Sequence, residues 1–128
     1  MTRKRLPPDD PLEWLNHANS NLAHARAVSP EVWFEDLCFD AQQAAEKAIK
    51  AIFIRRGERF PFIHDLEDLL RLLERTGLKI PKYVREADEL TRFAFRTRYP
   101  GLEAPVTKRT YRRAAAVLRW AERQILRP

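Results

Sequence analysis

The chain has 128 residues, 45% of them apolar and only 3 of them glycine, which is the composition of one folded domain and excludes a disordered or fibrous protein. Its single cysteine, Cys38, excludes an internal disulfide framework and a cysteine-rich zinc site. The net charge of +6 lies entirely in residues 105–128, and such a concentrated positive field attracts phosphates or an acidic protein surface.

Proline and glycine divide the chain into segments with helical periodicity and few β-branched residues. We therefore predict an all-α protein, a bundle of four to five antiparallel helices over residues 11–127 after an N-terminal extension of residues 1–10. No apolar run approaches the ~18 residues of a membrane span, and no apolar stretch follows the basic N-terminus as in a signal peptide. We expect a cytoplasmic protein.

The first predicted helix opens at Asp10-Pro11, an N-cap followed by proline at the first helical position, and runs to about Ala27. Its apolar stripe is expected to comprise Leu12, Leu15, Asn19, Leu22 and Ala23. The second helix is predicted to open in the same way at Ser29-Pro30 and to end at Gly57. Its alanine-rich middle permits close contact between helices.

Asp65 is the predicted N-cap of a third helix that ends at Gly77. A fourth helix is expected to start near Pro81 and to carry Val84, Ala87, Leu90 and Ala94 on one face, and a fifth to run from near Thr107 to the end of the chain. Trp14, Trp33 and Trp120 are expected to fill the core or an interface.

The second predicted helix contains several polar residues, although the rest of its sequence is apolar enough to predict a buried helix. They are Gln42, Gln43, Glu46, Lys47 and Lys50. They form either an ordinary exposed face, with Glu46 and Lys50 as a stabilising pair four residues apart, or a polar seam that faces a dimer partner or a ligand.

Two further segments contain side chains suited to chemistry. His64 directly precedes the Asp65 cap, where it either fixes the turn or acts as an acid or base. Arg96, Arg98 and Tyr99 precede a Pro-Gly turn, and an arginine beside an aromatic ring suits a phosphate with a stacked base, or alternatively the last carbonyls of a helix.

We expect neither a metal nor a cofactor. His17 and His24 lie seven residues apart on one predicted helix without a third ligand, and Cys38 is on a different helix. No glycine-rich phosphate loop is present, since each of the three glycines lies at a predicted helix end.

Three segments in this order and at this spacing resemble the HEPN family of small prokaryotic helical proteins. They are Phe39–Ala51 (FDAQQAAEKAIKA), His64-Asp65-Leu66 and Arg98-Tyr99-Pro100. The resemblance implies a helical bundle, commonly a homodimer, that is often encoded beside a minimal nucleotidyltransferase and forms a toxin–antitoxin pair with it. Many HEPN proteins are metal-independent ribonucleases with an Arg followed four to six residues later by a His, where the Arg stabilises the phosphorane and the His moves the 2′-hydroxyl proton.

This chain departs from the ribonuclease pattern, because His64 is its last histidine, so no arginine in the C-terminal half has a following histidine. Asp40 also stands where many relatives have histidine. The resemblance therefore leads us to expect a non-catalytic domain that binds nucleotide or RNA phosphate and acts with a nucleotidyltransferase. Its expected ligand-binding residues are Arg98, Tyr99, Arg96, Lys47, Lys50 and His64, with Arg98 on the phosphate and Tyr99 stacked on a base.

Two alternatives remain open. One is a degenerate ribonuclease with Arg98 as the anion stabiliser and His64 as the proton donor. The other is a protein-binding scaffold whose basic last helix docks an acidic partner.

Overall fold

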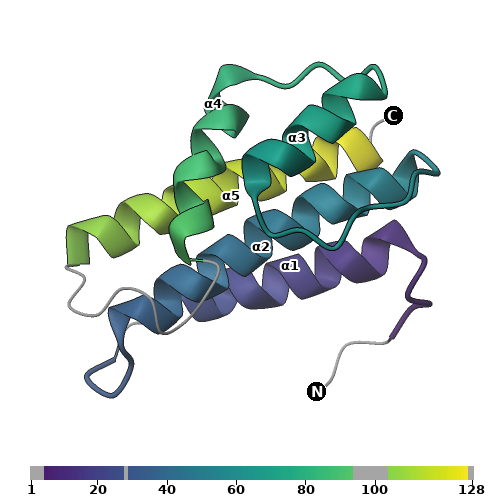
Figure 1. The fold of residues 1–128 in the computed structure, drawn as a ribbon. Coiled ribbons are helices and arrows are strands. Elements are labelled where there is room, and N and C mark those ends of the chain that lie inside the picture. The colour runs from purple at the N-terminus through teal and green to yellow at the C-terminus, as the bar shows by residue number, and fades with distance from the viewer. Residues whose placement is uncertain (1–4, 28, 94–103, 127–128) are drawn as a thin grey trace.

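The computed structural model describes residues 5–27, 29–93 and 104–126. These residues form helices and loops with no strand among them, which confirms the all-α prediction (Figure 1). The elements are α1 (Pro11–Ala25), α2 (Phe34–Arg55), α3 (Leu66–Arg75), α4 (Lys82–Arg85), the 3-10 helix η1 (Glu86–Phe93) and α5 (Ala104–Leu126). None of the helices in these ranges combines the length and the apolar character needed to cross a membrane.

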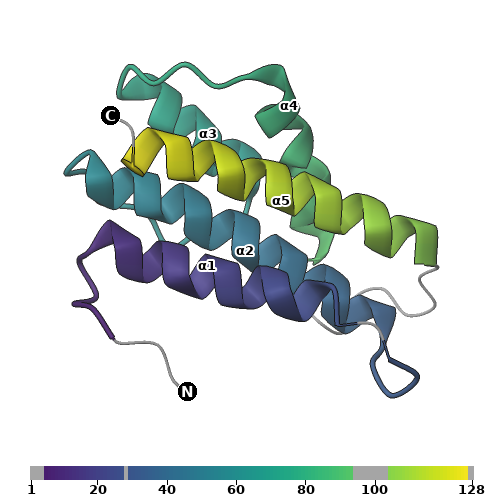
Figure 2. The same ribbon diagram turned by 180° about the vertical axis from the view of Figure 1, so that it is seen from behind.

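The three long helices lie side by side, with α2 between α1 and α5, in both ribbon views (Figures 1 and 2). The shorter elements form a second layer on one side, where α3 and η1 pack on α2, and α4 packs on α5. Helix α2 is therefore covered by neighbours along most of its circumference.

This central position explains the alanine-rich sequence of α2. Five of its alanines are at most 1% exposed: Ala41, Ala44, Ala45, Ala48 and Ala51. Small side chains at a helix contact shorten the distance between the helix axes, so α1 and α5 can both approach α2 closely. Ile49 and Ile52 fill the space that remains.

Side-chain caps fix two helix starts where the sequence predicts them. The Asp10 carboxylate accepts a hydrogen bond from Leu12 N at 2.8 Å, and the Asp65 carboxylate accepts one from Asp68 N at 3.1 Å. Helices α2 and α3 are each followed closely by glycine with positive φ, 72° at Gly57 and 99° at Gly77, as the predicted helix ends require.

The predicted start of the second helix is wrong by several residues. Ser29 Oγ accepts a hydrogen bond from Glu31 N at 3.2 Å, and its carbonyl accepts one from Val32 N at 3.1 Å. This local turn uses the groups that would cap a helix, so α2 begins only at Phe34, after an N-cap residue, Trp33, whose side chain makes no capping bond.

The fourth and fifth predicted helices also differ from the structure. Regular α-helix extends only over Lys82–Arg85 and continues as η1, while Ala94 lies outside the described residues. The buried residues Val84, Ala87, Leu90 and Phe93 recur every three residues, which is the period of a 3-10 helix and aligns them in one row. Helix α5 begins at Ala104, three residues before Thr107.

The apolar stripe predicted for the first helix is wrong in part. In α1 the buried face includes Ala18 and Ala25, whereas Leu12 is 39% exposed and Ala23 is exposed. Trp120 is buried in the core, whereas Trp33, directly before α2, is 72% exposed, so of its two predicted places only an interface is left.

Candidate functional site

Three of the six predicted ligand-binding residues belong to the described part of the chain. Lys47 and Lys50 are on α2, and His64 is in the loop that joins α2 to α3. The other three, Arg96, Arg98 and Tyr99, lie outside the described residues.

The carboxylate of Glu46 connects Lys50 and His64. Lys50 Nζ donates to Glu46 Oε2 at 3.0 Å, and His64 Nδ1 lies 2.9 Å from Glu46 Oε1. Gln42 Nε2 donates to the same Oε1 at 3.1 Å. We call Gln42, Glu46, Lys50 and His64 the Glu46 network.

Glu46 is ionised within this network. Burial raises the pKa of Glu46, but the hydrogen bonds from Gln42, Lys50 and His64 together outweigh it, so the pKa lies below its ordinary value. Since an ionised carboxylate only accepts hydrogen bonds, Nδ1 of His64 carries the proton that it donates. The network thus fixes both the orientation and the tautomer of the imidazole.

The polar residues of α2 face the chain's own loop. Gln42, which is fully buried, also donates to the backbone oxygen of His64 at 3.4 Å. Lys50 is 6% exposed and its Nζ lies 5.2 Å from the centre of the Phe60 ring. Gln42, Glu46 and Lys50 therefore anchor the segment 58–65 of the same chain, and they do not form the ordinary exposed face that was one of the two sequence-based alternatives. The ammonium of Lys50 is bound to Glu46.

Lys47 lies on another side of α2, toward α1. Its Nζ donates to Asn21 Oδ1 at 2.8 Å, and Asn21 Nδ2 donates to Asp40 Oδ1 at 3.3 Å. Burial lowers the pKa of Lys47, against the opposing effect of the carboxylates of Glu46 and Asp40. The structure therefore brings Lys50 and His64 together but keeps Lys47 in a separate contact.

Sequence reasoning missed the central role of Glu46, which it treated only as the helical partner of Lys50. The available signal was an acidic residue within the most alanine-rich part of a buried helix. A carboxylate in such a position needs several partners, and one lysine does not supply them.

A second charged group lies where α4 and η1 pack on α5. Tyr83, Arg109, Arg112 and Arg113 line a cleft of about 260 Å³, which we call the arginine cleft. Arg113 donates to Glu89 at 2.9 Å and also contacts Glu86, while Arg109 lies 3.7 Å from the same Glu89 carboxylate. From the next turns of α5, Arg123 donates to the hydroxyl of Tyr83 at 2.8 Å.

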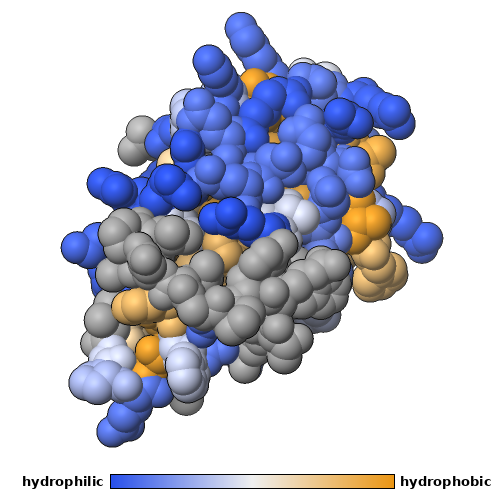
Figure 3. All heavy atoms as spheres, turned by 60° about the vertical axis from the view of Figure 1, so that its left-hand side comes forward, coloured by the Kyte–Doolittle hydropathy of each residue, from blue (hydrophilic) through white to orange (hydrophobic). Residues whose placement is uncertain are grey.

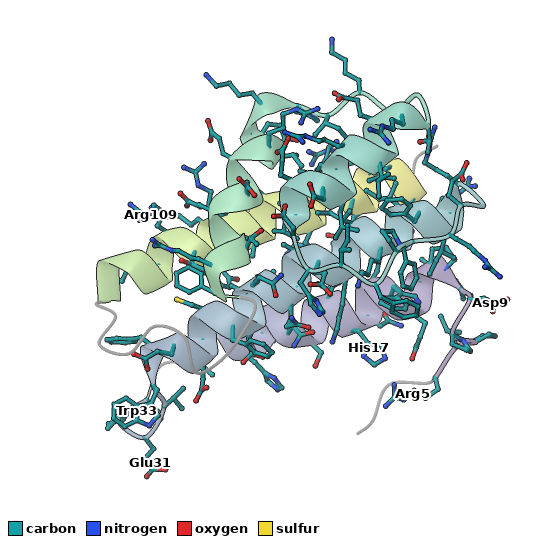
Figure 4. The ribbon with its side chains drawn as sticks, viewed as in Figure 1. Arg5, Asp9, His17, Glu31, Trp33 and Arg109 are labelled. Carbon is teal, nitrogen blue, oxygen red and sulfur yellow. The ribbon has the colours of Figure 1, made fainter. Side chains whose placement is uncertain are left out.

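Positive charge exceeds negative charge around this cleft. Arg112 and the nearby Lys108 have no ion-pair or hydrogen-bond partner within the part of the chain that the structure describes. Arg109, Arg112 and Arg113 share one face of α5, where like charges three and four residues apart repel. Arg109 projects from α5 into solvent (Figure 4), and hydrophilic side chains cover the upper part of the face seen in Figure 3. An anion bound in the cleft would relieve this repulsion.

The described residues contain no group of three His, Cys, Asp or Glu side chains placed to hold a metal ion. The Glu46 network and the arginine cleft instead supply cations, aromatic rings and the oriented imidazole of His64.

Comparisons with known proteins agree with the helical architecture. The sequence model of the HEPN domain matches residues 12–124. Among solved structures, TT1696 from Thermus thermophilus is similar to this chain with a TM-score of 0.78 and 28% identity, over 91% of this chain and 98% of that one. ST0689, an archaeal HEPN homologue, is similar with a TM-score of 0.71 and 25% identity, over 96% of this chain and 99% of that one. No curated protein matches. On the match over residues 12–124 and on these structural similarities, the chain belongs to the HEPN domain family.

Proposed function

We propose that this chain is a non-catalytic HEPN protein that binds nucleotide or RNA phosphate and acts with a nucleotidyltransferase partner in a toxin–antitoxin type system. The observation that carries phosphate binding is the arginine cleft, which gathers three guanidinium groups, of which only those of Arg109 and Arg113 lie near the carboxylates of Glu86 and Glu89. The planar guanidinium matches a phosphate with two parallel hydrogen bonds, and such charge-assisted bonds are about twice as strong as neutral ones.

We also assign to the binding site three residues outside the described part of the chain, which precede α5 in the sequence. In this proposal Arg98 holds a phosphate, Tyr99 stacks on a base, and Arg96 adds positive charge. Arg112 and Lys108 continue the row of cations on α5, because neither has an acidic partner among the described residues. Lys47, Lys50 and His64, the other predicted ligand-binding residues, make contacts within the fold and are not among the residues that line the cleft.

One observation supports the absence of catalysis. No arginine in the C-terminal half of the sequence is followed by a histidine, so that half lacks the arginine–histidine pattern of this family's ribonucleases; the spacing occurs in the sequence only at Arg59, five residues before His64.

The function is tested by the binding of a fluorescein-labelled single-stranded RNA, followed by fluorescence anisotropy at low and at physiological salt. The double variant Arg109→Ala/Arg112→Ala should bind about tenfold more weakly or worse, since it removes two cations from the cleft. Arg75→Ala, which removes an exposed arginine from α3, is the matched control and should bind like the wild type. If both variants bind RNA with equal affinity, the cleft does not contact RNA. If the wild-type protein captures an acidic protein but does not bind RNA, the scaffold function is favoured.

A second candidate function, metal-independent RNA cleavage, is favoured by the oriented imidazole of His64. Incubation of RNA with the protein in excess EDTA separates the two functions. The proposal expects intact RNA. Cleavage that disappears in both Arg98→Ala and His64→Ala would replace it with the degenerate ribonuclease.

A further inference from the structure

An aromatic groove of about 720 Å³ lies at the end of the molecule where α2 ends. Its walls come from the segment before α1, from α1 itself and from the loop that follows α2. Three aromatic side chains line the groove, Trp14, Phe60 and Phe62. Pro8 and Ile54 add apolar surface beside them. The volume lies within the range of about 300–1,000 Å³ that is typical of small-molecule sites.

The three rings stand at steep angles to one another. Trp14 and Phe60 have their centres 4.9 Å apart and their planes inclined by 69°, and Phe60 and Phe62 have values of 6.4 Å and 74°. Phe62 is 95% exposed, so both faces of its ring are open to solvent. The face of an aromatic ring carries partial negative charge, and rings inclined in this way present such faces from more than one direction. This is the arrangement of the aromatic cages that bind ammonium ions.

One ammonium group of the chain already lies against this aromatic surface. Lys50 Nζ is placed over the Phe60 ring, 5.2 Å from its centre, within the ~6 Å reach of a cation–π interaction. This ammonium is buried and bound to Glu46, so it is part of the fold. Among the described residues, no lysine or arginine lies over the ring of Phe62. The faces of Phe62 are therefore open to a cation from outside the chain.

Two exposed carboxylates line the same groove. Neither Asp9 nor Glu58 has a side-chain hydrogen bond or ion pair within the described ranges of the chain. Arg59 also lines the groove, so two carboxylates and one guanidinium give it a net negative charge, although the whole chain has a net charge of +6. Carboxylates accept hydrogen bonds from an ammonium group. The charges of the groove thus favour a cationic ligand.

Both walls of the groove are held in place. On the loop, Pro61 fixes its own φ and restricts Phe60 before it to extended backbone. The same loop is tied to α2 at His64, whose backbone oxygen accepts from Gln42. Because of these restraints, the rings of Phe60 and Phe62 are presented with little loss of conformational freedom on binding.

The opposite wall is a short strap, residues 5–10, that folds back on α1. The Glu13 carboxylate accepts from Leu6 N at 3.2 Å and from Arg5 at 3.2 Å. Trp14 Nε1 donates to the Pro8 backbone oxygen at 2.8 Å, which fixes the indole ring beside the strap.

We propose that the aromatic groove binds an aliphatic ammonium ion. The ammonium lies against the ring of Phe62 and donates hydrogen bonds to Asp9 or Glu58, while its methylene chain packs on the apolar walls. A free amine and a lysine side chain of another protein both supply this group, and the test includes both sources. The proposal does not depend on phosphate recognition by α5, because Asp9 and Arg109 lie at opposite ends of the molecule (Figure 4).

An NMR titration of the ¹⁵N-labelled full chain with n-butylammonium chloride tests the proposal, with 1-butanol as the neutral molecule of the same length. Butylammonium should shift the indole N–H signal of Trp14, which lies in the groove, and leave that of Trp33 unchanged. Butanol should bind about fivefold more weakly or worse, because it lacks the charge. Equal affinities for the two molecules would mean that the groove recognises only apolar surface, which overturns the proposal.

Variants locate the binding site. Phe62→Ala should weaken butylammonium binding about fivefold, through the loss of one cation–π contact. Asp9→Asn/Glu58→Gln should weaken it about tenfold, because both carboxylates lose their charge. Trp33→Ala/Glu31→Gln removes an exposed ring and an exposed carboxylate at the other end of the molecule (Figure 4) and is the matched control. Equal affinity of all these variants and the wild type would place the ion elsewhere and overturn the proposal.

Arg59→Ala distinguishes a cationic ligand from an anionic one. This change removes a like charge and should tighten butylammonium binding about twofold. Weaker binding by Arg59→Ala would contradict the proposed charge preference and overturn the proposal.

The same titration with Nα-acetyl-lysine methylamide identifies the source of the ammonium group. Tighter binding of this compound than of butylammonium supports a lysine side chain of another protein, and weaker binding supports a free amine. If neither compound shifts the Trp14 signal, the groove does not bind ammonium ions, whatever the result of the RNA titrations.

Discussion

At the scale of single residues, Glu46 shows how one buried carboxylate organises a loop. Its oxygens accept from α2 and from His64, eighteen residues later in the chain. The side chains of Glu46 and Lys50 are 5% and 7% exposed, so water does not screen their charges. The chain also has an exposed ion pair with the same four-residue spacing, Arg71 with Glu67, which makes a direct comparison possible.

Glu46→Gln should destabilise the protein by about 3 kcal/mol, because it leaves the buried ammonium of Lys50 without a counter-charge. Arg71→Ala should cost less than about 1 kcal/mol, as exposed pairs do. Urea unfolding of the two variants beside the wild type measures both free energies. Equal losses would show that burial does not strengthen the Glu46 network.

The sequence identifies the polar residues of the Glu46 network, but it does not predict which of them are in contact. Lys50 and His64 stand out as polar groups in apolar surroundings, and a helical spacing is enough to pair Lys50 with Glu46. The contacts of Glu46 and Gln42 with His64 depend on the path of the loop over α2, which no local pattern specifies. For the same reason, the grouping of Asp9, Trp14 and Phe62 in one groove is visible only in the folded chain.

At the scale of elements, boundaries were predictable where a side chain caps the helix. Asp10 and Asp65 make the expected bonds, and α1 and α3 begin where the sequence indicates. Ser29 makes a turn, and α2 begins without a side-chain cap at Trp33. The apolar spacing of three in η1 was available from the sequence but is also compatible with an α-helix.

Replacement of the N-cap residues should change stability in opposite directions. Trp33→Ser should stabilise the protein by about 0.5–1 kcal/mol, because it adds a capping hydroxyl and removes a ring that is 72% exposed. Asp65→Ala should destabilise it by about 1 kcal/mol. Thermal unfolding measures both changes, and a lower midpoint for Trp33→Ser would mean that the exposed ring has a stabilising contact.

At the scale of the whole molecule, two ionised glutamates couple distant segments to the bundle. The backbone hydrogen bond from Leu6 is the largest cause that lowers the pKa of Glu13, and this bond holds the strap on α1. The pKa of Glu46, which holds the loop on α2, is lowered as well. The ordinary pKa of both carboxyl groups is 4.5, so each group contributes its full stabilisation of the folded state above that pH.

Stability should therefore fall as the pH decreases from 4.5 through the lower pKa values of the folded state, since protonation removes the hydrogen-bond acceptors of Leu6, Lys50 and His64. Urea unfolding at pH values of about 7, 5 and 3 measures this dependence. Glu46→Gln should show a shallower decrease than the wild type. An identical pH profile for the two proteins would mean that Glu46 titrates alike in the folded and unfolded states.

The distribution of charge is also a property of the whole molecule. The net charge of +6 comes from the last 24 residues, and the fold directs Glu86 and Glu89 toward α5, where they neutralise Arg113 and partly Arg109. Arg112 and Lys108 have no such partner among the described residues.

The salt dependence of RNA binding by the wild-type protein tests phosphate recognition most directly. If the cations of α5 contact phosphates, the logarithm of the binding constant falls linearly with the logarithm of the salt concentration, with a slope of about −0.7 for each phosphate contacted. Loss of Arg109 and Arg112 together should then reduce the slope by about 1.4. Absence of binding at low salt, or binding that does not change with salt, would contradict phosphate recognition by this HEPN protein.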